Sequence, residues 1–583
     1  MASQRPLDCA LTGTDLLNSG VFNKGSAFSP QERIDFDIAG LLPAGVQTLD
    51  EQVERAYEQY RTRHDDDLAK NTFLASLKNQ NEILYYKLVS THIKEMLSVI
   101  YTPTEGDAIK EYSKLFRRPE GCFLNIDAID RVHHDLSLWG SPDDIDYIIV
   151  TDGEEILGIG DQGVGGGLIS SAKGVVATLC AGIPPSRILP IGLDCGTDND
   201  ALLRDELYLG LRRRRVRGEQ YDRFVGAFVG AARALFPCAL IHFEDFGLGN
   251  ARRLLDTYGP RMACFNDDVQ GTGCVALAAV MAALRVAGTR LRDVRMLVFG
   301  AGSAGVGVAD QVRNAIAEEG GVSRAEAARQ IWLIDRPGLL ASDTPVCEAQ
   351  QPYAKDASLW PPGARDLLSV VSAVRPHVLV GTSTAAGAFT EDVVRAMDRG
   401  LCEGEGEGEG AGRPVILPLS NPTRLQEASP GDLLAWTGGR ALVATGSPAA
   451  PVRGPRGGLV RVAECNNALV FPGICLGAVL SRAARLTEGM LVAAVRGLAE
   501  EGGEAVECST RGVGEDGAPP LLPDVTRASE ASVRVAAGVV RAAVEGDVAG
   551  REGIPRDEGP LRDWVRGAMW EPEYRPLRRS TGA

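Results

Sequence analysis

Two pairs of adjacent acidic residues precede a glycine-rich turn in this chain. The first acidic pair, Glu244 and Asp245, closes an apolar run, and the second acidic pair, Asp267 and Asp268, follows another apolar segment. The turn begins at Gly300. Carboxylates with water favour hard cations such as Mg²⁺ or Mn²⁺, and a glycine-rich turn cradles phosphate. Together they suggest metal-assisted redox chemistry on a small, oxygen-rich acid.

A run of charges is usually a solvated face, which is the alternative interpretation of both acidic pairs. Here each pair ends an apolar segment that is expected to be buried. Adjacent buried carboxylates repel one another unless a cation compensates them. The two pairs therefore favour a metal site.

The glycine-rich turn has the context that a dinucleotide-binding motif requires. It follows the apolar run 294–299 and opens a helical stretch, so its backbone can approach a pyrophosphate at a helix N-terminus. The residues expected to bind the cofactor there are Gly300, Gly302, Ser303, Ala304 and Gly305. A glycine turn without a ligand is the alternative.

An acidic residue at the end of the next apolar run bears on the choice of cofactor. Asp335 closes the run 331–335 and is placed to bond the adenosine ribose, which favours NAD over NADP. Its spacing from Gly305 is longer than usual, and the stretch 318–329 accounts for the extra length. Arg336 follows and could serve a 2′-phosphate, so NADP remains open.

Several other side chains could do chemistry. Lys173 follows a glycine-rich loop in an apolar setting that should lower its pKa and suit it as a base; the alternative is a helix lysine that extends to solvent. Tyr101, before a rigid Thr-Pro turn, could be a general acid or a packing residue. Three amides stand near strand ends, where they could cap helices or bind substrate: Asn421, Asn466 and Asn467.

The size and composition indicate a multidomain globular protein. With 583 residues, 44% of them hydrophobic, roughly two to four domains are expected. A net charge of −16 argues against nucleic acid and an anionic membrane as partners. The N-terminal segment lacks the features of a signal or transit peptide, so a cytoplasmic location is expected.

The order of elements predicts an α/β fold. Residues 47–100 have helical periodicity, and short apolar runs alternate with helical stretches from about residue 290, which is typical of a doubly wound, Rossmann-type parallel sheet. We read 403–410 and 500–525 as loops and 526–549 as a helix. The expected domains are a helical N-terminal domain (1–119), an α/β substrate and metal domain (120–266, with 468–535 returning to it), an NAD(P)-binding domain (267–467) and a C-terminal helix and tail (536–583).

Taken together, the chain resembles malic enzymes almost from end to end, from residues 23–28 to Trp570. The matching motifs lie at residues 101–104, 151–154, 158–163, 194–199, 242–246, 265–272, 419–423, 466–467 and 471–473. The resemblance implies oxidation of L-malate with NAD or NADP and its decarboxylation to pyruvate. It also implies a homo-oligomer, either a dimer or a tetramer.

The resemblance also implies roles for individual residues. Lys173, helped by Asp267, would take the proton from the C2 hydroxyl while hydride leaves for the nicotinamide, and Tyr101 would then protonate enolpyruvate. Mn²⁺ or Mg²⁺ would act as a Lewis acid. The metal ligands would be Glu244, Asp245 and Asp268. The substrate carboxylate would be bound by Asn421, which is also expected to contact the cofactor, and by Asn466 or Asn467.

Two positions depart from the pattern of this family. Fumarate-activated relatives have arginine where this chain has Gln80, before Asn81 and Glu82, so activation by fumarate at that site is not expected. Many malic enzymes have arginine where this chain has Glu155, and an acid cannot replace a guanidinium fork. The alternative function is therefore a non-catalytic, cofactor-binding subunit of a malic enzyme assembly. A metal-dependent 2-oxoacid decarboxylase without redox chemistry is a third option, which the turn at Gly300 and Asp335 disfavour.

Overall fold

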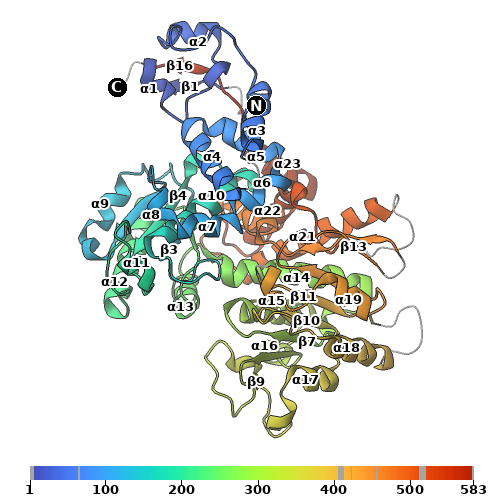
Figure 1. Ribbon diagram of the computed structural model, residues 1–583. Coiled ribbons are helices and arrows are strands. Elements are labelled where there is room, and N and C mark those ends of the chain that lie inside the picture. Colours follow the sequence, from blue (N-terminus) through green and yellow to red (C-terminus); the bar gives the residue numbers. More distant parts are fainter. Residues whose placement is uncertain are drawn as a thin grey trace.

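Two parallel sheets, joined by a layer of long helices, organise the computed structural model (Figure 1). The structure describes residues 5–63, 66–404, 412–421, 423–454, 457–510 and 520–580. Most of the predicted loop 403–410 and Pro422 of the motif 419–423 lie outside this range, whereas residues 403 and 404 end a helix.

The first sheet has five parallel strands in the order β2-β4-β3-β5-β6. Their bounds are β2 (Cys122–Asn125), β4 (Ile188–Asp194), β3 (Tyr147–Thr151), β5 (Leu240–Phe243) and β6 (Cys264–Asn266). One face packs on α9 (Val132–Ser137) and α12 (Glu219–Leu235), and α10 (Gly167–Ala181) covers the other. All residues of β3 and β5 are buried, as in a sheet covered on both faces.

The second sheet has seven strands in the order β15-β12-β11-β10-β7-β8-β9, of which only the edge strand β9 is antiparallel to its neighbour. Their bounds are β15 (Ala463–Glu464), β12 (Leu442–Thr445), β11 (Val415–Pro418), β10 (Val378–Gly381), β7 (Met296–Phe299), β8 (Ile331–Asp335) and β9 (Gly338–Leu339). The strand order reverses between β7 and β10, which is where such sheets bind dinucleotides. The predicted Rossmann-type sheet is confirmed.

Alternation along β7 determines which helices cover each face. Met296 and Val298 pack with α14 (Thr272–Ala287) and α15 (Ser303–Gly320), whereas Leu297 packs with α17 (Leu367–Val374) and α18 (Glu391–Gly404). The helix α19 (Pro430–Trp436) lies on the same side as α18.

Helices form most of the N-terminal region, as the periodicity of 47–100 predicts. They are α3 (Leu49–Arg61), α4 (Asp67–Gln80), α5 (Glu82–Thr91), α6 (Ile93–Ile100), α7 (Thr104–Lys110) and α8 (Tyr112–Leu115). The two chain ends meet at the top of Figure 1, where β1 (Leu7–Cys9) pairs in parallel with β16 (Leu577–Arg579). This pairing was not predicted, because strands this short show little hydrophobic periodicity.

Three helices after the second sheet return to the centre of the molecule: α20 (Phe471–Ser481), α21 (Glu488–Thr510) and α22 (Ala528–Glu545). They form one core with α10 and α14. The predicted loop 500–525 is wrong over 500–510, because α21 continues to Thr510. Leu498 and Ala499, one turn earlier in α21, are buried in the core and hold this helix in place. The proposed domain boundaries remain a proposal.

Two stretches of the described chain, Gly163–Ala181 and Asp267–Ala287, are long and apolar enough to cross a membrane. Both stretches are mostly buried inside the protein, because they contain the core helices α10 and α14. The absence of a membrane partner stays a prediction.

Candidate active site

The two acidic pairs lie at the same edge of the five-stranded sheet. Phe243 ends β5 and Asn266 ends β6, and these residues are partners in neighbouring parallel strands. The residues that follow them therefore emerge side by side. The second pair begins a single π-helical turn, Asp267–Gly271, whose first residues are held by the Asn266 side chain accepting from the Val269 amide.

Three carboxylates of these pairs converge. Glu244, Asp245 and Asp268 each offer an oxygen, and these oxygens all lie within 4.8 Å of one another. Octahedral Mg²⁺ with ligands at about 2.1 Å needs oxygens roughly 3–4 Å apart, so the set matches a hard divalent cation. The backbone fixes two of them, since Asp268 accepts from the Asp245 amide at 2.9 Å and Asp245 accepts from the Leu157 amide at 3.2 Å.

The electrostatics of this cluster also fit a cation. Burial raises the pKa of Asp245 well above its usual range, and the nearby Asp268 and Glu244 carboxylates raise it further. Burial and the Glu244 charge raise the pKa of Asp268 to about 7. Bringing these carboxylates together in the ionised state is therefore costly, and a divalent cation offsets the cost.

Lys173 on α10 points into the same cluster. Its side chain is 2% exposed, its Nζ lies 2.9 Å from Glu244 Oε1, and it also donates to Asp267. Burial alone would lower its pKa, but the Asp267 and Glu244 carboxylates outweigh burial and raise the pKa well above its usual value. The predicted lowering of this pKa by an apolar setting is wrong, because α10 faces two buried acids, Glu244 and Asp267, that are distant from Lys173 in the sequence.

Tyr101 lies next to Lys173. It follows α6 directly, is 5% exposed, and places its ring 5.5 Å from Lys173 Nζ. Burial raises the pKa of the Tyr101 phenol, and Glu244 and Asp267 raise it further. Tyr101 is thus protonated at neutral pH and can act as a proton donor.

The adjacent residues Asn466 and Asn467 have different hydrogen-bond partners. Asn467 donates to Asp267 Oδ2 and to Thr272 Oγ1, both at 3.0 Å. Asn466 instead bonds Glu464 at 2.9 Å and accepts from the Ala468 amide. Only Asn467 of the two contacts a residue of the cluster through a hydrogen bond within the described chain.

A buried histidine, which the sequence analysis did not single out, supports the cluster from behind. His242 Nε2 lies 2.6 Å from Glu244 Oε2, and His242 Nδ1 lies 2.5 Å from the Tyr147 hydroxyl. These bonds orient Glu244. His242 lies in β5 and Glu244 directly follows that strand, so the alternation of side chains in an extended segment could have indicated the contact.

The glycine-rich turn closes the carboxyl end of β7 at the reversal of strand order. Gly300 has φ +107°, and a Cβ there would come within 2.5 Å of the Thr382 carbonyl carbon that follows β10. A Cβ at Gly305 would collide with the Gly300 carbonyl oxygen. Gly302 caps α15, so Ser303 and Ala304 present free amides at its N-terminus.

The remaining predicted cofactor residues lie at the same edge of this sheet. Asp335 ends β8, beside β7, and its carboxylate accepts from the Arg336 amide at 2.8 Å. Asn421 follows β11 and is exposed, and its side-chain oxygen accepts from the Ser447 hydroxyl. Neither residue has a hydrogen bond to the carboxylate cluster within the described chain.

Glu155, one departure from the family pattern, lies beside the cluster without entering it. Its amide donates to the Asp245 carbonyl at 3.1 Å, while its side chain is exposed. Partial desolvation of the carboxyl and the neighbouring Glu154 and Asp161 charges raise the pKa of Glu155. The adjacent Glu154 pairs with Arg217 at 2.5 Å, which places one guanidinium near this turn.

Comparison with known proteins gives a consistent result. Residues 78–259 match the family model "Malic enzyme, N-terminal domain", and residues 269–544 match "Malic enzyme, NAD binding domain". The chain is 48% identical to "NAD-dependent malic enzyme, mitochondrial" of Saccharomyces cerevisiae, over 98% of this chain and 84% of that protein. It is 44% identical to "NAD-dependent malic enzyme" of Schizosaccharomyces pombe, over 99% of each.

A solved structure shares the fold. The malic enzyme of Entamoeba histolytica superposes with a TM-score of 0.53 at 20% identity, covering 92% of this chain and 91% of that one.

Proposed function

Because the chain belongs to the malic enzyme family, we propose that it oxidises L-malate with NAD and releases pyruvate and CO₂, with Mg²⁺ or Mn²⁺ bound. The observation that carries this proposal is the position of Lys173. Its ammonium, 2% exposed, bridges Glu244 of the first acidic pair and Asp267 of the second. A base candidate and a cation site thus share one buried cluster.

The divalent cation would be held by Glu244, Asp245 and Asp268, whose oxygens lie close enough to ligate one ion. When bound, it supplies Lewis-acid polarisation of the substrate oxygens. His242 and the Leu157 amide hold two of these carboxylates in place, so the ligands are arranged before the cation arrives.

Lys173 takes the proton from the C2 hydroxyl as hydride passes to the nicotinamide of NAD. The Glu244 and Asp267 carboxylates raise the pKa of Lys173. A divalent charge held by Glu244 would oppose that attraction and favour the neutral, basic form of Lys173. Asp267 keeps the lysine oriented, and Asn467 holds Asp267.

Tyr101 delivers the proton to C3 of the enol after CO₂ leaves. Its raised pKa keeps the phenol protonated until that step. Lys173, 5.5 Å from its ring, is the neighbouring group from which the phenol can regain a proton. The two residues therefore form one proton pathway along the cluster.

Asn467 is the better candidate for the substrate carboxylate, because its hydrogen bond to Asp267 places it beside the acidic pairs, whereas Asn466 bonds Glu464. Asn421 contacts the cofactor, since it follows β11 at the carboxyl edge of the seven-stranded sheet. The pyrophosphate is bound by the backbone from Gly300 to Gly305 at the start of α15, and Asp335 bonds the adenosine ribose.

The test is production of reduced cofactor from L-malate by the purified protein with Mn²⁺, with NAD and NADP compared and EDTA as control. The proposal expects metal-dependent NADH formation, with a higher kcat/KM for NAD than for NADP. NADH formation that persists in EDTA would contradict the metal's role, and a strong NADP preference would contradict the role of Asp335.

Assembly as a dimer or tetramer and a cytoplasmic location stay predictions. The Saccharomyces cerevisiae relative is named as mitochondrial.

A further inference from the structure

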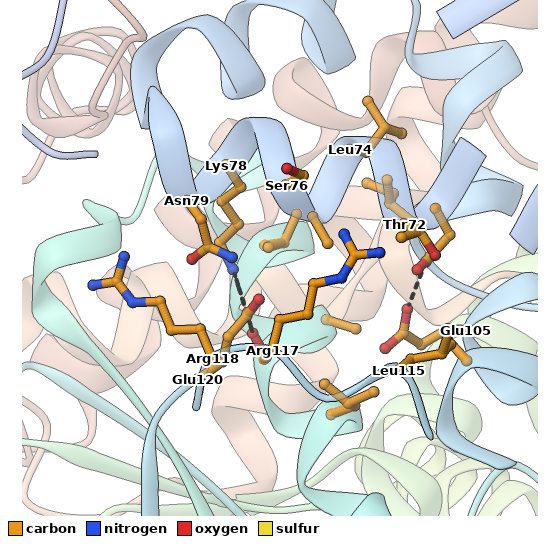
Figure 2. A pocket seen from close by; sticks show the side chains of 18 of the residues that line it. Thr72, Leu74, Ser76, Lys78, Asn79, Glu105, Leu115, Arg117, Arg118 and Glu120 are labelled. Carbon is orange, nitrogen blue, oxygen red and sulfur yellow. Dashed lines mark hydrogen bonds and ion pairs between the residues drawn. The ribbon is translucent and has the colours of Figure 1, made fainter. Parts of the chain in front are cut away.

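A buried carboxylate lies between the loops that follow β10 and β11. Glu427, between β11 and α19, is 0% exposed, and a Cβ on Gly381 at the end of β10 would come within 2.5 Å of its carboxyl carbon. A buried carboxylate usually faces a cation, as Glu120 does at 2.8 Å from Lys78 beside α4 (Figure 2). Among the residues that the structure describes, no basic side chain pairs with Glu427, so hydrogen bonds stabilise its charge.

Two serines supply these hydrogen bonds. Ser383, in the loop after β10, donates its amide and its hydroxyl to Glu427 Oε1 at 2.9 and 2.8 Å. Ser420, after β11, donates its hydroxyl to Oε1 at 2.5 Å and its amide to Oε2 at 3.4 Å. The two hydroxyls in turn accept from the amides of Ala385 and Thr384. Each of these partners donates to Glu427, which suits an acceptor-only carboxylate.

The loop after β10 is strained at the point where Glu427 holds it. Thr384 has a φ of +57°, which a β-branched residue rarely adopts. Such a backbone persists only where its surroundings fix it. The Thr384 amide donates to Ser420 Oγ at 2.8 Å, and the same hydroxyl donates to Glu427. Glu427 therefore fixes this loop through Ser420 as well as through Ser383.

Both loops lie at the proposed cofactor site. Thr382, directly before Ser383, donates its hydroxyl to the Gly300 carbonyl at 2.7 Å, so the loop after β10 contacts the glycine-rich turn. Asn421, which is proposed to contact the cofactor, directly follows Ser420. A dinucleotide crosses such a sheet at the reversal of strand order. With the adenosine half at β7 and β8, the loops after β10 and β11 are left for the nicotinamide half.

We propose that Glu427 is a positioning residue for the cofactor, whose buried carboxylate holds the loops after β10 and β11 in the arrangement that binds the nicotinamide half of NAD. Glu427 acts through Ser383 and Ser420. The inference rests on the proposed function, because it concerns NAD binding. The proposed metal ligands follow strands of the other sheet, so a change at Glu427 should leave metal binding intact.

The first test compares Glu427→Gln with Glu501→Gln in the full-length protein. Glutamine keeps the size of the side chain but loses the charge and replaces one acceptor oxygen by a donor. The Kd for NADH, measured by calorimetry, should rise at least tenfold in Glu427→Gln, while the Kd for Mn²⁺ stays within twofold. Glu501, which is 1% exposed and pairs with Arg527 and Arg534, is a buried carboxylate in the helical layer. Glu501→Gln should lower the melting temperature and leave NADH binding unchanged.

A second variant keeps the test valid if Glu427→Gln does not fold. Ser420→Ala removes only the hydroxyl that joins Glu427 to the Thr384 amide. It should weaken NADH binding about fivefold or more. In the double variant the effect should be smaller than the product of the two single effects, because both changes break the same link. Thermal melting establishes which variants fold.

Kinetics separate positioning from general damage. Glu427→Gln should raise the KM for NAD at least tenfold, while the KM for L-malate at saturating NAD stays within twofold. NADH bound as tightly by the folded variants as by the natural protein would overturn the inference, as would equal weakening in Glu501→Gln. A natural protein that binds NADH but forms none from L-malate would instead contradict the proposed function, and the binding comparison would still decide the role of Glu427. No NADH binding by the natural protein would overturn both.

Discussion

Replacement of Lys173 by methionine should lower kcat while tightening metal binding. The ammonium lies 2.9 Å from Glu244 Oε1, where a unit charge pair is worth about 6 kcal/mol at an effective dielectric of about 20. Lys173 thus competes with a divalent cation for the same carboxylate. An ammonium about 4 Å from a cation repels it by roughly 1–4 kcal/mol for each unit of the cation's charge. Removal of the Lys173 ammonium should therefore tighten Mn²⁺ binding about tenfold or more.

The catalytic effect has the opposite sign. Loss of a general base typically lowers the rate by about 10²–10⁴, so Lys173→Met should lower kcat at least a hundredfold with Mn²⁺ saturating. Mn²⁺ binding is followed by calorimetry at pH 7 and kcat by NADH absorbance. Lys110→Met, which removes an exposed lysine paired with Asp107, is the matched control. Near-normal kcat would refute the assignment of Lys173, and weaker Mn²⁺ binding would refute the electrostatic argument.

Four further predictions follow from the same geometry. Tyr101→Phe should lower kcat about a hundredfold with KM little changed, and steady-state kinetics showing a normal kcat would remove its role as donor. Asn467→Ala should raise the KM for L-malate about tenfold or more, whereas Asn466→Ala should not; the reverse order would contradict the hydrogen bonds seen. Asp335→Ser should raise kcat/KM for NADP relative to NAD, and an unchanged ratio measured with both cofactors would assign the preference elsewhere. Because Asp268 has a pKa of about 7 and only its ionised form ligates, calorimetric Mn²⁺ affinity should fall as pH drops below about 7, and a flat profile from pH 8 to 5.5 would contradict this.

The position of the acidic pairs could be predicted from the sequence because each pair ends a buried strand. Strands such as β5 and β7 have continuous apolar runs, and parallel neighbours bring their carboxyl ends to one edge. The convergence of Glu244, Asp245 and Asp268 follows from that rule and from one backbone turn.

Interactions between distant segments could not be predicted in the same way. The pKa of Lys173 depends on Glu244 and Asp267, which approach it only when α10 covers the sheet. The separation of Asn466 from Asn467 depends on which of two adjacent side chains turns inward. Sequence position alone predicts neither the pKa of Lys173 nor the orientation of the two amides.

The loop prediction is wrong in one helix. The helix α21 runs to Thr510, through the glycines at 502 and 503, because its preceding turns are fixed in the core against α22. Tertiary packing here outweighs the roughly 1 kcal/mol helix cost of a glycine.

The most direct test of the account is the stoichiometry of the complete reaction. L-malate, NAD and Mn²⁺ are incubated with the protein, and NADH, CO₂ and pyruvate are quantified together. If one cluster serves cation, base and proton donor, as proposed, NADH, CO₂ and pyruvate are expected in equal amounts. NADH without CO₂ would show that oxidation and decarboxylation are not joined at this site, and the absence of NADH despite measured NAD binding would favour a non-catalytic subunit.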